Sequence, residues 1–335
     1  MAALIRVGVN MEKEIKGHLF NLIIYTAEKR RADYFEQMVH SLIEKFPSRV
    51  IHIRCDKGGT SHVKLEPCDH RCEHMTISSS LEKIDEVPFV ILPHLVPDLP
   101  IYLLWGDDPT AENPILSALE KLSTRLIFDT ESAVNLQAFA QKMLNKVETL
   151  NIEFMDISWA EIAGWRDVIS QVFLTRNQLN YLRQCNTIHI KYNQLNDDFI
   201  QHDTVQAIYL QGWLAAQLEW KFNQVKEIDG EHHIFYEGRK VVLTPQKRAT
   251  LNPGLIFEIS CINDEKLKTT LTFADKQSKV MVYISTPDHC EVPYSLQLQV
   301  MQTGATAMKE MFYFRPSHHY RNMLNAIGQI PWESF

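Results

Sequence analysis

The chain has 335 residues, of which 45% are hydrophobic and 22% charged, and its formal net charge is −7. This acidic balance excludes a general nucleic-acid binder, which needs a basic surface to displace counterions. No long uninterrupted apolar segment occurs, and the N-terminus lacks the apolar stretch of a secretory signal. We therefore expect a cytoplasmic protein with two domains.

The first half of the chain alternates between strand and helix character. The spacing of apolar residues predicts strands at 19–25, 49–53, 101–105 and 125–128, and helices at 33–46, 114–122 and 136–147, with a short helix opened by Pro88. A polar loop rich in Gly, Cys and His is expected from the second strand up to about His74. The alternation predicts an α/β domain, a mostly parallel sheet with helices on both faces.

The second half has a different character. We expect helices at 165–174 and 204–220, a hairpin formed by 234–236 and 241–243, and further strands at 255–262, 271–273, 280–285 and 294–300. This order predicts an α+β domain with an antiparallel sheet. We assign the domains to residues 1–155 and 156–335, with the boundary between about Asn151 and Leu182.

A proline-bounded turn precedes the strand at 101–105. Pro97 and Pro100 lie on either side of Asp98. The stiff backbone at these prolines fixes the direction of the Asp98 side chain. Trp105 ends the strand, where α/β proteins place ligand contacts. Asp98 is thus a candidate for a cap, an ion pair or a partner contact, with a turn-forming role as the simpler interpretation. For Trp105 the simpler interpretation is a buried position at the sheet edge.

Two more candidates lie in the segment that joins the domains. Trp165 is expected in the core, where tryptophan near helices usually packs. Arg166 follows it directly, and a guanidinium is rarely buried without a partner. We expect Arg166 to pair with Asp98, Asp129 or Asp156, or with a partner protein.

Cysteine and histidine gather between residues 52 and 74. The set comprises His52, Cys55, His62, Cys68, His70, Cys72 and His74. Zinc prefers these ligands and a structural site needs four of them, yet Cys68 and Cys72 stand alone, with no second pair at finger-like spacing. We predict no metal, and a polar loop from which Cys72 starts a strand. A reversible bond between Cys68 and Cys72 is the alternative.

Motifs of catalysis and nucleotide binding are missing from the sequence. No G-x-G-x-x-G, no G-x-x-x-x-G-K-[ST] and no G-x-S-x-G occurs, and the pairs His232-His233 and His318-His319 are adjacent residues that point apart in a strand. We predict no cofactor and no catalytic residues. The residues alone therefore favour a binding or regulatory protein over an enzyme.

Four blocks of sequence carry a resemblance to a known family. They are Leu95–Trp105, Phe46–Ile51, the pair Asp156–Trp159 and Gly164–Val168, and Tyr209–Leu218. In this order and spacing they resemble the OpcA family of glucose-6-phosphate dehydrogenase assembly proteins. The chain departs from the family pattern at Trp105, a single tryptophan where members often carry two adjacent ones.

The resemblance implies a partner and a role. A member of this family is expected to bind glucose-6-phosphate dehydrogenase, to assist its oligomeric assembly and to raise its activity, in support of the oxidative pentose phosphate route. It does not transfer hydride itself. The candidates for the contact surface are Asp98, Trp105, Trp165 and Arg166.

Two alternatives from other classes stay open. One is a sugar-phosphate enzyme or sensor with its site at the carboxyl ends of the first-domain strands, near Asp98, Trp105 and Asp129. Its phosphate would need cations, and the nearest in sequence are Lys57, Arg49 and Arg125. The other is a redox-responsive adaptor that uses the cysteines between Cys55 and Cys72.

Overall fold

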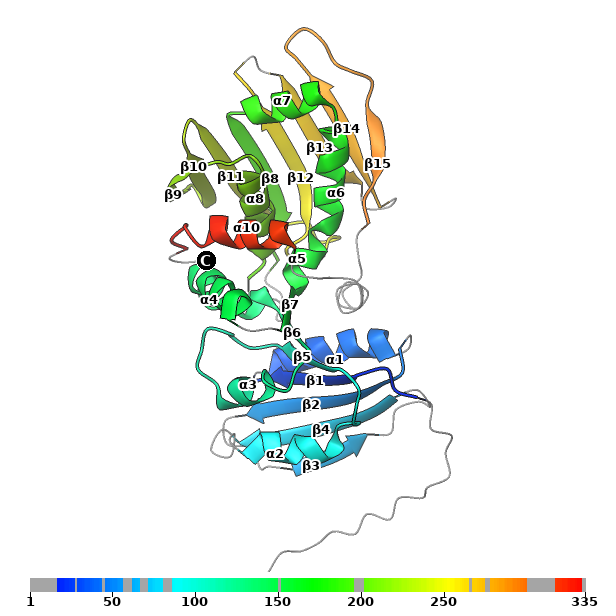
Figure 1. Cartoon of the computed structure of the whole chain (residues 1–335). Helices are drawn as coiled ribbons and strands as arrows, with labels where there is room; N and C mark the ends of the chain where they lie inside the picture. The colour runs from blue at the N-terminus through cyan, green and yellow to red at the C-terminus, as the bar shows by residue number, and fades with distance from the viewer. Residues whose placement is uncertain are drawn as a thin grey trace, which may run out of the picture.

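The computed structural model describes residues 17–27, 29–43, 46–56, 62–66, 72–80, 86–149, 152–195, 202–264, 267–274, 278–299 and 317–332. Two β-sheets organise these residues, one formed by each half of the chain. In Figure 1 the first half lies at the bottom and the second half at the top. Within the described ranges, every helix is too short or too polar to span a bilayer.

Seven strands form the first sheet, in the order β3-β4-β2-β1-β5-β6-β7. They are β1 (Asn21–Thr26), β2 (Ser48–Asp56), β3 (His62–Glu66), β4 (Cys72–Ser80), β5 (Ile101–Trp105), β6 (Arg125–Phe128) and β7 (Glu153–Asp156). All neighbouring pairs are parallel except β3 and β4. From β1 the chain passes to β2 on one side and later to β5 on the other, so the strand order reverses between β1 and β5.

Helices cover both faces of this sheet. They are α1 (Lys29–Ile43), α2 (Val87–Ile91), α3 (Pro114–Leu119) and α4 (Leu136–Thr149), with the short 3-10 helices η2 (Leu92–His94) and η3 (Thr130–Ser132). Phe35 of α1 clusters with Leu22 and Ile24 of β1, whereas α2, α3 and α4 cluster with Ile23 and Tyr25. Successive strand residues point to opposite faces, so α1 lies on one face and the other three helices on the opposite face.

Eight strands form the second sheet, in the order β15-β14-β13-β12-β8-β11-β10-β9. They are β8 (Thr187–Asn193), β9 (Phe222–Ile228), β10 (Glu231–Tyr236), β11 (Arg239–Gln246), β12 (Ile256–Ile262), β13 (Lys268–Ala274), β14 (Lys279–Ser285) and β15 (Tyr294–Gln297). The central pair of β8 and β11 is parallel and the other pairs are antiparallel. The sheet is therefore mixed, with mostly antiparallel pairing.

Within the part of the chain that the structure describes, five helices accompany the second sheet. They are α5 (Ile157–Glu161), α6 (Ala163–Val172), α7 (Arg176–Gln184), α8 (Val205–Gln217) and α10 (His318–Ile327). Residues 205–215 of α8 are all buried, so this helix lies inside the molecule. A Cβ at Gly212 would lie 2.4 Å from Cγ2 of Ile327, so only glycine at this position lets α10 pack so closely against α8.

Helix α10 joins the two halves. It packs against α8 of the second half and α4 of the first, and Figure 1 shows it between them. The Gln137 side chain of α4 donates a hydrogen bond of 3.2 Å to the carbonyl of Gly328, just after α10. Buried apolar residues of both halves belong to one hydrophobic cluster, so the core continues from one sheet to the other.

The predicted fold class is confirmed, and the strands predicted at 101–105 and 125–128 have those bounds. The expectation of a polar loop up to about His74 was wrong in part, because His62–Glu66 alternates polar and apolar residues and forms β3 beside β4. The strand β7 ends at Asp156, one residue past the assigned end of the first domain. The domain boundary itself stays a prediction.

Candidate functional site

The carboxyl edge of the first sheet is the place where this architecture offers a ligand site. In open α/β sheets, ligands bind outside the carboxyl ends of the strands, at the point where the strand order reverses. That point lies here between β1 and β5, which end at Thr26 and Trp105. The sequence after β1 reads Thr26-Ala27-Glu28-Lys29 and lacks the glycines of a dinucleotide-binding motif.

Two aromatic side chains stack at these strand ends. The rings of Tyr25 and Trp105 stack at 4.0 Å between centroids with an interplanar angle of 6°. Each of the two side chains is only 1% exposed. Beyond the strand, a Cβ at Gly106 would lie 2.1 Å from the ring of Phe35 in α1, so helix and strand end are in close contact. The chain's own side chains therefore occupy the space at the reversal point.

A second group of side chains closes the ends of β6 and β7. Asp156 ends β7, and its Oδ2 accepts hydrogen bonds from the hydroxyls of Thr130 (2.6 Å), Tyr209 (2.6 Å) and Tyr320 (2.9 Å). Its Oδ1 accepts from the backbone N–H of Ser158 at 3.0 Å and caps α5. We call Asp156, Thr130, Tyr209 and Tyr320 the Asp156 cluster.

The Asp156 cluster is polar but buried. Burial raises the pKa of the Asp156 carboxyl, and the hydrogen bonds from its three hydroxyl partners oppose that rise. The pKa values of Tyr209 and Tyr320 also lie well above the ordinary value, first because of burial and then because of Asp156. Thr130 follows β6, whereas Tyr209 and Tyr320 belong to α8 and α10. The cluster therefore fastens the edge of the first sheet to two helices of the second half.

Arg166 lies close to this cluster through Trp159. Its guanidinium carbon lies 3.5 Å from the centroid of the Trp159 ring, and its Nη1 donates to the Trp159 carbonyl at 2.6 Å. The Trp159 ring in turn lies 5.5 Å from the ring of Tyr320. The flat guanidinium group suits cation–π stacking of this kind, so Arg166 stabilises the position of Trp159.

The four predicted interface residues lie in different surroundings. Asp98 is exposed in a turn with a positive φ of 64°, and the Asn21 side chain of β1 holds that turn through the carbonyl of Val96. Trp105 is buried as described, and Trp165 is 3% exposed, with its Nε1 donating to the carbonyl of Ile256. Of the four, Asp98 has the most accessible side chain, and the interface interpretation stays a prediction.

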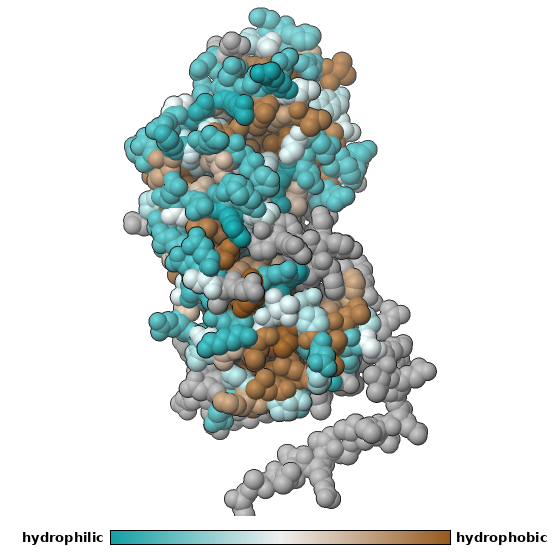
Figure 2. Space-filling model, in the orientation of Figure 1, coloured by the Kyte–Doolittle hydropathy of each residue, from teal (hydrophilic) through white to brown (hydrophobic). Residues whose placement is uncertain are grey.

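An exposed apolar segment lies beside Asp98 and was not predicted. Phe89 of α2 is 76% exposed and Leu92 of η2 is 45% exposed, with Pro93 and Pro97 exposed next to them. Figure 2 shows brown atoms gathered over the lower half, the half in which α2 lies in Figure 1. The sequence offered a signal, because two prolines in one short apolar stretch prevent a regular helix that could bury all of its apolar side chains.

Some histidines of the predicted Cys/His loop lie in strands of the first sheet. His52 of β2 is fully buried, and its Nε2 lies 3.0 Å from the hydroxyl of Thr26. Burial lowers the pKa of His52 to about 3, with further contributions from Arg54 and His74. Among the described residues, no three Cys, His, Asp or Glu side chains gather as a metal site would need. Cys68 and His70 lie outside the described residues.

The residues of the sugar-phosphate alternative do not come together. Arg49 and Arg125 begin β2 and β6, and Asp98 precedes β5, so all three lie near the amino edge of the sheet. Trp105 and Asp129 lie at the carboxyl edge, about 16 Å away along a five-residue strand. Arg49 donates to the carbonyl of His94 at 2.9 Å, and Arg125 forms an ion pair with Glu153. Lys57 lies outside the described residues.

Solved structures show which class of protein has this fold. UDP-N-acetylglucosamine 3-dehydrogenase GnnA from Acidithiobacillus ferrooxidans aligns with a TM-score of 0.53 at 8% identity, over 94% of this chain and 97% of that chain. The 3-ketoreductase KijD10 from Actinomadura kijaniata aligns with a TM-score of 0.51 at 9% identity, over 92% and 94%. The chain thus has the two-part fold of these solved structures.

Sequence comparison identifies the family within this fold. The model for the glucose-6-phosphate dehydrogenase subunit N-terminal domain matches residues 18–145, and the model for the C-terminal domain of the same subunit matches residues 152–324. The chain belongs to the OpcA family of glucose-6-phosphate dehydrogenase assembly proteins, as the resemblance predicted.

Curated relatives carry the same family name. The OxPP cycle protein OpcA of Nostoc punctiforme is 23% identical over 163 residues, which are 49% of this chain and 33% of that protein. The OxPP cycle protein OpcA of Synechocystis is 26% identical over 153 residues, or 44% of this chain and 30% of that protein. The matches therefore span about a third of the length of these relatives.

Proposed function

We propose that this chain binds glucose-6-phosphate dehydrogenase, favours its active oligomer and carries out no hydride transfer itself. Family membership supports the partner. The sequence after β1, which lacks the glycines of a dinucleotide-binding turn, supports the non-catalytic part, as does the Tyr25–Trp105 stack packed at the adjoining strand ends. Such a protein would support the oxidative pentose phosphate route.

The physical mechanism is linkage. A protein that binds the active oligomer more tightly than the inactive form shifts the population by that difference in affinity and by no more. A tenfold preference corresponds to about 1.4 kcal/mol, which one well-packed aromatic anchor can supply. A rigid binding surface makes this more efficient, because less conformational entropy is lost on association.

The contact surface in this proposal is the proline-bounded segment around Asp98. Phe89 and Leu92 present apolar side chains, and the exposed carboxylates of Glu86 and Asp98 flank them. A partner that fits would offer an apolar pocket beside basic side chains. Trp105 and Trp165 are buried, so in this proposal they act on the surface only by supporting the fold. Arg166 does the same through Trp159.

The test mixes the chain with the dehydrogenase of the same organism and measures enzymatic rate and sedimentation. We expect the rate to rise or the oligomer to change, and Phe89→Ser to weaken the effect by roughly tenfold. Val134→Ser is the matched control, since Val134 is 72% exposed but lies before α4, outside the segment. An unchanged rate and an unchanged oligomer at micromolar concentrations would reject the partner. Equal loss in both variants would reject the surface.

A further inference from the structure

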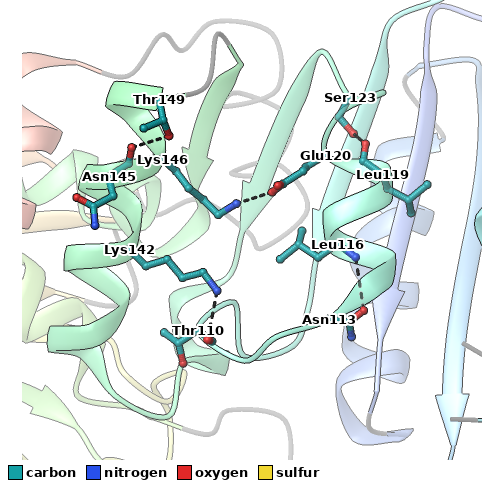
Figure 3. A network of polar contacts seen from close by, with 10 residues as sticks. All are labelled: Thr110, Asn113, Leu116, Leu119, Glu120, Ser123, Lys142, Asn145, Lys146 and Thr149. Carbon is teal, nitrogen blue, oxygen red and sulfur yellow. Dashed lines mark hydrogen bonds and ion pairs between the residues drawn. The ribbon is translucent and has the colours of Figure 1, made fainter. Parts of the chain in front are cut away.

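A groove lies between helices α3 and α4. Its volume is about 520 Å³, within the range of small-molecule sites, and it opens on the helix-covered face of the first sheet. Its polar lining residues are Glu112, Asn113, Ser117, Glu120, Lys142 and Lys146. Figure 3 shows the two lysine side chains reaching from α4 toward α3 and the loop that precedes it. We call this space the α3–α4 groove.

The two lysines differ in how their charges are balanced. Lys146 forms an ion pair with Glu120 across the groove. Lys142 instead donates a hydrogen bond of 3.2 Å to the carbonyl of Thr110, and among the described residues it forms no ion pair. Burial lowers the pKa of Lys142 and the charge of Lys146 lowers it further, whereas the charges of Asp108, Glu120 and Glu112 partly offset this fall. A half-buried ammonium group that forms no ion pair with any described residue therefore faces the groove.

The nearby acidic groups act on Lys142 through their charge, but each has other partners or lies at the rim of the groove. Both carboxylate oxygens of Asp108 contact the Thr110 hydroxyl, at 2.7 and 2.8 Å, and Oδ1 also accepts from the Thr110 N–H. Glu120 is engaged by Lys146, and Glu112 is exposed at the rim of the groove. An anion that entered the groove would pair with Lys142 and lose little by desolvation, because the ammonium group is already partly buried.

The remaining groups of the groove suit hydroxyl groups. Ser117 offers a hydroxyl on the exposed side of α3, and the carboxylate of Glu112 accepts hydrogen bonds. Asn113 is already committed, since its Oδ1 caps α3 and its Nδ2 donates to the Tyr25 hydroxyl at 3.0 Å. The groove therefore offers Lys142 to an anionic group, and Glu112 and Ser117 to hydroxyl groups. These groups suit a ligand that carries one anionic group and several hydroxyls.

We propose that the α3–α4 groove binds a sugar phosphate, with Lys142 on the phosphate and with Glu112 and Ser117 on the sugar hydroxyls. This site goes beyond the proposed function, because it needs no protein partner. It differs from the carboxyl-edge site that the sequence suggested, since its cations come from α4 and not from the strands.

The test is calorimetric titration of the chain alone with glucose 6-phosphate, inorganic phosphate and glucose. We expect glucose 6-phosphate to bind more tightly than phosphate, and glucose more weakly than either. Lys142→Met should weaken binding of glucose 6-phosphate by roughly tenfold or more. Lys121→Met is the matched control and should leave binding unchanged, because Lys121 is exposed just beyond α3 and does not line the groove.

A second variant should act in the opposite direction. Glu120→Gln removes the partner of Lys146 and adds a second uncompensated cation, so binding should strengthen several-fold. Residues with only structural roles would not give changes of opposite sign at positions 142 and 120. No heat of binding at millimolar glucose 6-phosphate, or unchanged binding by Lys142→Met, would overturn the site. Equal affinity for phosphate and glucose 6-phosphate would overturn the sugar part.

Discussion

Two places on the same edge of the first sheet are closed by opposite means. At the ends of β1 and β5, Tyr25 and Trp105 stack in the hydrophobic core, and the stack is held by contact between rings. At the ends of β6 and β7, the Asp156 cluster brings one carboxyl group and three hydroxyls together inside the molecule. The first closure depends on packing and the second on hydrogen bonds.

The two closures differ in which parts of the molecule they connect. The aromatic stack belongs to the first sheet alone, whereas the Asp156 cluster joins residues of both halves. A polar group of the Asp156 cluster that lost its partners while still buried would destabilise the fold. Because the partners come from both halves, the cluster fixes the orientation of one half relative to the other. A fixed orientation suits a protein that presents one rigid surface to a partner.

The largest expected effect comes from removing the carboxyl group of the Asp156 cluster. Asp156→Ala leaves three buried hydroxyls and the Ser158 N–H without their acceptor, and we expect a loss of about 3–4 kcal/mol in the free energy of unfolding. Chemical denaturation measures this loss. Asp167→Ala, at an exposed position of α6, is the control and should change stability little. A loss below about 1 kcal/mol at Asp156 would show that the halves do not depend on the cluster.

Local signals in the sequence were sufficient for most of the first sheet. The strands at 101–105 and 125–128 are apolar runs with proline, threonine, glycine or aspartate at their ends, and these residues stop a strand. The strand β8 was missed although it lies in the centre of the second sheet. Its sequence Thr-Ile-His-Ile-Lys-Tyr-Asn alternates, because only one of its faces is in the core. Such alternation is the usual pattern of a half-buried strand, so the sequence did carry the signal for this central strand.

The candidate site was less predictable, because its members are far apart in sequence. The Asp156 cluster combines residues 130, 156, 209 and 320, and no local pattern connects them. Asp156 and Tyr209 did lie in family-like blocks, but nothing in those blocks shows that they meet. Conversely, Trp105 was recognised at the end of its strand, while the stacking partner Tyr25 is 80 residues away and was treated only as part of a strand.

The next expected effect is on how stability depends on pH, where His52 and the Asp156 carboxyl act in opposite directions. His52 lies beneath α1 in the first sheet, and its pKa in the folded state is about 3. The unfolded chain binds the proton near pH 6.5, so stability falls as the pH drops below that value. Between pH 7.5 and pH 5 we expect a loss of about 2 kcal/mol. His52→Gln should flatten this part of the profile.

The control for this profile is the exposed His318, where the same substitution should leave the slope as it is. The Asp156 carboxyl has a pKa shifted upward, so it acts in the opposite sense: its stabilising effect is present in acid and declines as the pH rises through its folded-state pKa. Asp156→Asn should remove that decline. A slope below pH 6.5 that survives in His52→Gln would contradict the assignment to His52.

The smallest expected effect compares one hydroxyl at each closure. The Tyr25 hydroxyl accepts one hydrogen bond, from Asn113, so Tyr25→Phe should cost about 1 kcal/mol. The Tyr209 hydroxyl donates to Asp156 and lies 2.7 Å from the Thr130 hydroxyl, so Tyr209→Phe should cost about 2 kcal/mol. Denaturation of the two variants side by side measures the difference. Because both substitutions keep the ring and its packing, a larger loss at Tyr25 would mean that the aromatic closure depends on its hydrogen bond more than on stacking.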